Sequence, residues 1–234
     1  MRRMTELTGH PGKTRSPSEA RILVMTAVEA ERDAVLRGLD GDGRFEVRLC
    51  GVGPASAAAR TAVALGSGDP WTLVVSAGIA GGYPEVAPVG TLAVGTDAVA
   101  ADLGVETAEG FASVEELGFG ASKLAADAKL AEELLQALNR AGLVAASGPI
   151  VTASTATGTA ATAAVRSARV PGAVAEGMEG YGVAIAATYA DKPFIELRAI
   201  SNAVGPRDRD AWRIGDALTA LSAAFAILKE VELN

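Results

Sequence analysis

Histidine and cysteine are nearly absent from this 234-residue sequence, which contains only His10 and Cys50. One cysteine cannot form a disulfide within the chain, which favours a reducing, cytoplasmic location. His10 lies in residues 1–20, a segment rich in Arg, Gly, Pro and Ser that we expect to be a disordered tail. The composition therefore excludes a Ser-His-Asp triad, a Cys-His pair and zinc held by histidines. Carboxylates, amides, hydroxyls, arginine, lysine and the backbone must supply the chemistry, and we expect no metal and no cofactor.

Aromatic residues and positive charge are also scarce. Aromatic residues make up 4% of the chain and apolar residues 49%, so the core must consist mainly of Ala, Val, Leu and Ile. The net charge of −7 argues against a nucleic-acid partner, which would need a basic surface. The first 20 residues contain no apolar block, so they predict neither a secretory signal nor a membrane span. Nothing near Cys50 would activate a thiol, and we interpret it as a small buried apolar residue.

Apolar runs of strand length alternate with helical segments along the rest of the chain. Strands are predicted at 21–28, 44–50, 71–77, 91–100, 143–152 and 193–201, and helices at 29–39, 55–65, 123–140, 178–190 and 210–231. This alternation predicts an α/β fold of three layers, with a mostly parallel central sheet and helices on both faces. No linker or repeat interrupts it, so we expect residues 21–234 to form a single domain.

Polar side chains stand at the ends of these strands. Glu29 and Glu31 follow the first strand, and Asn202 follows the last one. Glu179 is an isolated carboxylate in an otherwise apolar segment, where it is costly unless it has a partner. Because the carboxyl ends of parallel strands share one edge of a sheet, these groups are expected to meet in one crevice.

Each feature also has a simpler interpretation. Carboxylates such as Glu29 and Glu31 are favourable at a helix N-terminus without any catalytic role. Gly51-Val52-Gly53 could begin a dinucleotide fingerprint, but the third glycine is replaced by Ser56, so a simple turn is favoured. The glycines of residues 78–82 could admit a ligand to the backbone or merely form a tight connection, and Asn202 could be a turn asparagine.

Five motifs follow one another in an order that resembles the purine nucleoside phosphorylase superfamily. They are Glu29-Ala30-Glu31, Gly51–Gly53, Gly78–Gly82, Met178-Glu179 and Arg198–Asn202. The resemblance covers residues 21–231 and is greatest to its nucleoside-hydrolysing branch, which includes the methylthioadenosine/S-adenosylhomocysteine nucleosidases and the futalosine hydrolases. Residues 201–208 and 212–214 are most similar to the futalosine hydrolases. The resemblance implies a nucleoside-phosphorylase-like fold and a homo-oligomer that is a dimer or is built from dimers.

The resemblance also implies roles for individual residues. Glu31 corresponds to the carboxylate that activates water, Arg198 to an arginine near that water, and Asn202 to the group that binds the purine edge. These three are the candidate catalytic residues. The candidate substrate-binding residues are Met178 against the ribose, Glu179 on its hydroxyls, and Ile79, Ala80, Gly81 and Ser201 beside them.

Two positions depart from the nucleosidase pattern. Ile79 stands where those enzymes have a serine, which removes one polar contact near the sugar. Asn202 stands where they have an aspartate. An amide can donate to the O6 of a purine and accept from N7, so Asn202 favours hypoxanthine or guanine over adenine. It cannot deliver a proton itself.

The residues leave several functions open. The main hypothesis is hydrolysis of a purine N-ribosidic bond, with futalosine as substrate, water as co-substrate and hypoxanthine as product, in menaquinone biosynthesis. The alternatives are a 6-oxopurine nucleoside phosphorylase, a methylthioadenosine or aminodeoxyfutalosine nucleosidase, and a nucleoside-binding protein without activity. If the substrate carries a benzoate, Arg207, Arg209 or Arg213 is expected to bind its carboxylate, unless these arginines simply pair with Asp208 and Asp210.

Overall fold

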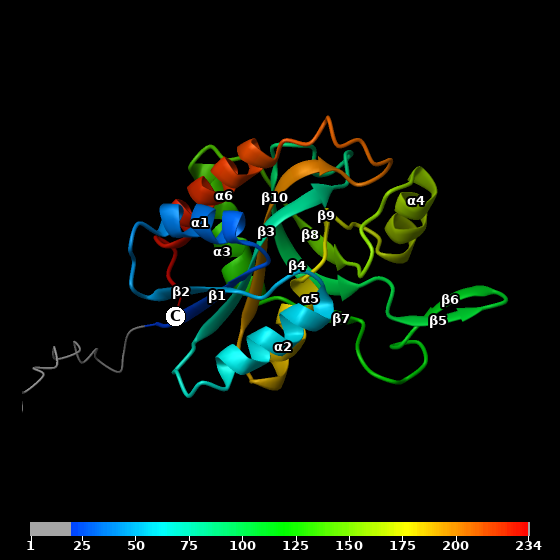
Figure 1. Ribbon diagram of the computed structural model, residues 1–234, viewed down its shortest axis with the longest axis horizontal. Coiled ribbons are helices and arrows are strands. Elements are labelled where there is room, and N and C mark those ends of the chain that lie inside the picture. Colours follow the sequence, from blue (N-terminus) through cyan, green and yellow to red (C-terminus); the bar gives the residue numbers. More distant parts are fainter. Residues whose placement is uncertain (1–19, 234) are drawn as a thin grey trace, which may run out of the picture.

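A computed structural model describes residues 20–233 of the protein (Figure 1). The predicted tail lies outside the described residues apart from Ala20, as does His10. Within the described range, no helix has the length and apolar character needed to cross a membrane.

Helices and strands alternate along most of the chain (Figure 1). The helices are α1 (Glu29–Leu39), α2 (Pro54–Leu65), α3 (Ala128–Arg140), α4 (Ala160–Arg169), α5 (Gly180–Tyr189) and α6 (Ile214–Leu228). The strands are β1 (Ile22–Thr26), β2 (Phe45–Leu49), β3 (Leu73–Gly82), β4 (Leu92–Ala100), β5 (Gly104–Thr107), β6 (Gly110–Ser113), β7 (Lys123–Ala125), β8 (Ala145–Thr152), β9 (Ala175–Gly177) and β10 (Phe194–Ala203).

The central sheet has the order β10-β4-β8-β9-β3-β1-β2, with β7 added alongside β4. A further pairing between β10 and β3 closes five of these strands into a barrel-like ring. The pairs of β1 with β2 and β3, of β3 with β10, and of β8 with β4 and β9 are parallel. The pairs β4–β10, β3–β9 and β4–β7 are antiparallel.

The prediction of an α/β fold is therefore confirmed, but the sheet is mixed rather than mostly parallel. The reason lies between β3 and β4. A parallel crossover normally contains a helix, whereas the chain passes from Gly82 to Leu92 without one. β4 consequently returns in the opposite direction and pairs antiparallel with β10.

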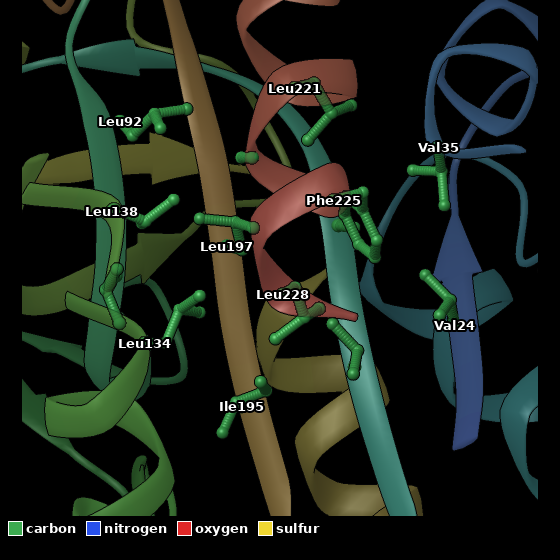
Figure 2. Packing of buried hydrophobic residues seen from close by; sticks show 14 of the residues in the cluster. Val24, Val35, Leu92, Leu134, Leu138, Ile195, Leu197, Leu221, Phe225 and Leu228 are labelled. Carbon is green, nitrogen blue, oxygen red and sulfur yellow. The ribbon is translucent and has the colours of Figure 1, made fainter. Parts of the chain in front are cut away.

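Helices cover both faces of the sheet, and each face has its own apolar core. α1, α3 and α6 pack on one face, where Leu221, Phe225 and Leu228 of α6 lie among apolar side chains from the strands (Figure 2). α2 and α5 pack on the other face, against side chains such as Leu23 and Val74. As predicted, small and aliphatic residues dominate both clusters.

Two predicted helices have wrong boundaries. The helix predicted at 123–140 begins only at Ala128, because Lys123–Ala125 forms β7 and the Asp127 side chain caps the helix by accepting a hydrogen bond from the Leu130 amide at 3.0 Å. The last helix, predicted at 210–231, begins at Ile214 and ends at Leu228. The stretch between β4 and β7, for which we predicted neither helix nor strand, contains the β5–β6 hairpin, which extends away from the central sheet (Figure 1).

Candidate active site

A cavity of about 480 Å³ opens at the carboxyl ends of β1, β3 and β10. This is the edge of an α/β sheet where ligands commonly bind, and the volume suits a small organic molecule. Eight of the nine predicted site residues line the cavity: Glu31, Ile79, Ala80, Gly81, Met178, Glu179, Ser201 and Asn202. The ninth, Arg198, lies directly behind it and is only 1% exposed.

Glu31 is held in the cavity wall by three backbone amides. Its Oε2 accepts from the amides of Ala27 and Val28 at 2.9 and 3.2 Å, and its Oε1 accepts from Ile79 at 2.8 Å. The side chain is 4% exposed. Burial raises the pKa of Glu31 above its usual value, although the Arg198 charge and these hydrogen bonds oppose the change. Glu31 is therefore a fixed carboxylate that is a stronger base than an exposed glutamate.

Arg198 lies between three carboxylates. Its Nε donates to Glu196 Oε1 at 2.9 Å, and its Nη1 lies 3.5 Å from Glu179 Oε2. A third contact joins Nη2 to the hydroxyl oxygen of Ser76 at 3.0 Å. Burial opposes the positive charge, but the carboxylates of Glu196, Glu179 and Glu31 outweigh it and raise the pKa of Arg198. The guanidinium is thus a permanent cation behind the cavity.

Gly78 makes room for this arrangement. A Cβ atom at this position would lie 2.4 Å from Glu31 Oε1 and 2.8 Å from Arg198 Nη1, closer than real side chains approach. Glu31 and Arg198 therefore both occupy the space that a side chain on β3 would fill. From the sequence, the Gly78–Gly82 motif could admit a ligand or merely form a tight connection. At Gly78, the absence of a side chain lets the charged groups of Glu31 and Arg198 approach β3.

Glu179 is also buried but keeps part of its carboxylate for a ligand. Its Oε1 accepts from the Gly53 amide at 3.2 Å, and its Oε2 accepts from Met178 at 3.3 Å. Gly53 has a φ of 91°, a conformation that favours glycine. The Gly51–Gly53 turn, which we interpreted as a simple turn, therefore also supplies a donor to Glu179.

The strand end opposite Glu31 carries Ser201 and Asn202. The Ser201 hydroxyl donates to Asn202 Oδ1 at 2.9 Å, and Asn202 Nδ2 donates to the Ala203 carbonyl at 3.0 Å. These contacts orient the amide and leave one N–H of Nδ2 for a ligand. Ile79, Ala80 and Gly81 form the adjacent wall.

The segment after β10 closes one side of the cavity. Arg207 and Trp212 line it, and the Arg207 Cζ lies 5.6 Å from the centre of the Trp212 ring. Arg209 and Arg213 do not line it. The structure thus distinguishes among three arginines that the sequence left equivalent.

A buried ion pair was missed by the sequence reasoning. Glu176 Oε2 accepts from Arg166 Nη1 at 2.9 Å, and Glu176 also accepts from the backbone and hydroxyl of Thr157, each at 2.7 Å. Arg166 donates further to the Thr155 carbonyl at 2.8 Å. Glu176 and Thr157 line the cavity, so this pair holds one of its walls. A charged residue between apolar neighbours at 173–177 was the available signal.

Two other residues considered in the sequence, Glu29 and Cys50, do not line the cavity. Glu29 is exposed and does not line the cavity, whereas Glu31 two residues later does. Cys50 is fully buried, and burial raises the pKa of its thiol to about 12, in agreement with its interpretation as a small apolar residue. Within residues 20–233, no group of three or more His, Cys, Asp or Glu side chains could hold a metal ion.

Comparison with known proteins gives a consistent assignment. A model of the phosphorylase superfamily matches residues 22–231. The chain is 48% identical to a futalosine hydrolase of Streptomyces coelicolor, over 90% of this chain and 95% of that protein. It is 47% identical to a futalosine hydrolase of Acidothermus cellulolyticus, over 88% of this chain and 89% of that protein.

Solved structures share the fold at lower identity. A 5′-methylthioadenosine/S-adenosylhomocysteine nucleosidase from Neisseria meningitidis superposes with a TM-score of 0.79 at 21% identity, covering 90% of this chain and 98% of that one. The futalosine hydrolase of Helicobacter pylori has the same TM-score at 16% identity, covering 92% of this chain and all of that one. From the family model and the two close relatives, this chain belongs to the phosphorylase superfamily and, within it, to the futalosine hydrolase family.

Proposed function

We propose that the protein hydrolyses the N-ribosidic bond of futalosine and releases hypoxanthine. The observation that carries this proposal is the convergence of Glu31, Glu179 and Asn202 on one cavity, in a chain 48% identical to a futalosine hydrolase. Three groups are needed for this reaction: a base for water, an acceptor for the ribose hydroxyls and a polar contact for the departing purine.

The reaction passes through an oxocarbenium-like state at C1′, as in other glycoside hydrolyses. Glu31 removes a proton from the attacking water. Glu179 accepts from the ribose hydroxyls and fixes the sugar relative to that water. The C1′–N bond breaks with its electron pair going to the base, and the free N–H of Asn202 stabilises the departing hypoxanthine anion by a hydrogen bond. The anion then takes up a proton from solvent and Glu31 returns the water proton to solvent, so that protons balance. Arg198 lies behind Glu179 and compensates part of its charge.

Hydrolysis fits this cavity better than phosphorolysis. A phosphate nucleophile would lie beside C1′, where Glu31 and Glu179 present negative charge. Arg198 could offset this charge, but it is already engaged by Glu196 and Glu179. Water needs no such compensation.

The direct test is incubation of the purified protein with futalosine, aminodeoxyfutalosine, inosine and methylthioadenosine, with and without phosphate. Hypoxanthine released from futalosine at a rate independent of phosphate is expected. Turnover that requires phosphate would indicate a phosphorylase, and binding of futalosine without turnover would indicate a nucleoside sensor.

Glu179→Gln is expected to raise KM and to lower kcat, because the ribose hydroxyls lose a charged acceptor. Charge-assisted hydrogen bonds contribute about 1.5–3 kcal/mol, so kcat/KM should fall roughly 10- to 150-fold. The measurement compares ribo- and 2′-deoxynucleosides. The wild type should prefer the ribonucleoside, and the variant should lose most of this preference; equal preference in both proteins would contradict the ribose contact.

Asn202→Asp is expected to shift the base preference from 6-oxopurines toward 6-aminopurines. An ionised carboxylate cannot donate to O6 but can accept from an exocyclic amine. Sites built around hydrogen bonds discriminate strongly against mismatched partners. The measurement is the ratio of futalosine to aminodeoxyfutalosine cleavage, and an unchanged ratio would show that the base is recognised by other residues.

Arg207→Ala is expected to impair futalosine cleavage selectively. Arg207 stands beside the Trp212 ring at the cavity, where its guanidinium can bind a carboxylate while the ring packs against an aromatic group. Loss of one charge-assisted contact should lower kcat/KM for futalosine about 10-fold or more. Inosine lacks the carboxylate and serves as the control substrate, while Arg209→Ala is the matched control variant. Equal losses on both substrates would contradict the contact.

We further propose that residues 21–234 form one domain, while the predicted tail at 1–20 lies outside the described residues apart from Ala20. The family resemblance supports a homo-oligomer that is a dimer or is built from dimers, and the single cysteine is compatible with a cytoplasmic location. Sedimentation of the full chain and of a chain starting at Arg21 tests the oligomeric state and the tail together.

A further inference from the structure

Glu196 is a buried carboxylate that the proposed reaction does not use. It lies on β10, two residues before Arg198, and has no exposed surface. It is not among the residues that line the cavity. Its Oε1 accepts from Arg198 Nε at 2.9 Å, while its Oε2 has no hydrogen-bond partner among residues 20–233. A buried carboxylate with one free oxygen is costly, so it needs an explanation.

The neighbouring chain leaves space for this carboxylate. Gly180 is the first residue of α5 and directly follows Glu179. A Cβ atom on Gly180 would lie 2.3 Å from both carboxylate oxygens of Glu196. Even alanine is therefore excluded at position 180 while Glu196 keeps its place. The Glu196 carboxylate of β10 therefore packs directly against Gly180, the first residue of α5 and the neighbour of Glu179.

The sheet register explains why Glu196 acts on Arg198. Glu196 pairs with Ser76 of β3, and Arg198 pairs with Gly78. Alternate residues of a strand share one face, so both β10 side chains lie over Ser76 and Gly78. Of the two carboxylates bonded to the guanidinium, Glu196 is the nearer, at 2.9 Å against 3.5 Å for Glu179.

We infer that Glu196 is a positioning residue for the hydrolytic site, because it holds Arg198 back from Glu179 and partly cancels the Arg198 charge. This keeps Glu179 available to the ribose and Glu31 basic enough to accept a proton from water. The inference rests on the proposed function for its kinetic consequences, but its electrostatic consequence concerns the protein without substrate.

The charges around Glu196 set the direction of the effect. Arg198 faces it from the same strand, and Glu179 from the segment before α5. Glu31 of α1 acts on the Arg198 guanidinium across Gly78. Burial raises the pKa of Glu196, and Arg198 opposes this rise. Removing the Glu196 charge leaves the Arg198 cation less compensated, which should lower the pKa of Glu31 and draw Glu179 toward the guanidinium.

The alternative role is purely structural: Glu196 would then only compensate the buried Arg198 cation and fill the space beside Gly180. Three variants separate the two roles. Glu196→Gln removes the charge and keeps the shape. Gly180→Ala keeps the charge and displaces it. The double variant Gly180→Ala/Glu196→Val removes the charge and restores the space. Ile195→Val, on the opposite face of the same strand, is the control for disturbance of β10.

The first readout needs no substrate. Carbon-detected NMR titration of the Glu31 carboxyl group should give a pKa lower by about 0.5 or more in Glu196→Gln and in the double variant than in the wild type and Ile195→Val. The second readout is kinetic. Because Glu196→Val leaves the buried Arg198 cation without its nearer carboxylate, the double variant should melt below the wild type. At temperatures where it is fully folded, kcat/KM for futalosine should still fall about 10-fold or more, with its acid limb moved to lower pH.

A double variant with wild-type kinetics and an unchanged Glu31 titration would overturn the inference and leave Glu196 a structural residue. An unchanged titration in Glu196→Gln would overturn it as well. Failure of the wild type to release hypoxanthine would instead contradict the proposed function, and the Glu31 titration would still decide whether Glu196 positions the charged cluster.

Discussion

Glu31→Gln is expected to lower kcat for hypoxanthine release about 10²-fold or more, because general base catalysis of this kind contributes roughly 10²–10⁴ in rate. The structure adds a second reason. Backbone amides donate to both carboxylate oxygens of Glu31. A glutamine must turn its NH₂ group toward one of these donors, so it cannot reproduce both sets of contacts. The side chain then loses its basicity and its fixed position together.

The matched control for this prediction is Glu29→Gln. Glu29 lies in the same first turn of α1 but is exposed and stands outside the cavity. It should retain wild-type kcat and KM. Nucleoside binding should survive in Glu31→Gln, as measured by titration calorimetry, since Glu179 and Asn202 are unchanged. Near wild-type turnover of the variant would remove Glu31 from the mechanism.

The raised pKa of Glu31 gives a pH dependence that can be checked in the wild type. Only the ionised carboxylate accepts a proton from water, so kcat/KM should fall as the pH is lowered through the pKa of Glu31. Because burial raises this pKa, the acid limb should lie above 4.5, the ordinary value for glutamate. The folded protein also binds this proton more tightly than the unfolded chain. Ionisation of Glu31 therefore costs stability as the pH rises from 4.5 through the raised pKa.

The residues at strand ends could be predicted because their position follows from local pattern. A run of apolar residues identifies β1 and β10, and the polar residues at or just beyond the end of each strand must then lie at the same edge of the sheet. Glu31 and Asn202 both line the same cavity. Their roles rest on the family resemblance and stay predictions.

Features that depend on distant pairing could not be predicted in the same way. Several strands share the same apolar pattern, so this pattern does not determine which strands pair. It therefore could not predict that β4 pairs antiparallel with β10 or that β10 also pairs with β3. The sequence likewise gave no reason to prefer Arg207 over Arg209, because only the path of the chain after β10 turns one of them toward the cavity. The Arg166–Glu176 pair joins α4 to β9, and no spacing rule relates two such elements.

Arg166→Ala is expected to be among the most destabilising single substitutions in the chain. Arg166 and Glu176 have side chains 9% and 5% exposed, and they contact each other at 2.9 Å. Removing one partner of a buried ion pair leaves an uncompensated charge, at a cost of about 3–5 kcal/mol. Urea unfolding followed by circular dichroism measures this loss as a lower midpoint.

The control is the double variant Arg166→Met/Glu176→Gln, in which no charge remains buried. It should recover most of the lost stability, because the penalty of the single variant comes from the unpaired Glu176 carboxylate. Arg169→Ala, one turn further along α4, should lose much less, since its guanidinium stacks on Phe111 and donates to the neutral Ala101 carbonyl at 3.2 Å. A single variant as stable as the wild type would contradict the argument.

Arg166→Ala should also disturb the cavity, an effect that is not expected from substitution of an ordinary core residue. Arg166 holds the carbonyl of Thr155 and the hydroxyl of Thr157, and Thr157 forms part of the cavity wall. Glu31 and Asn202 stand on other elements and keep their contacts. In conditions where the variant is fully folded, KM for futalosine should therefore rise while kcat changes little, because the wall loosens and the reacting groups stay in place. A fall in kcat at unchanged KM would mean that this ion pair supports the chemistry itself.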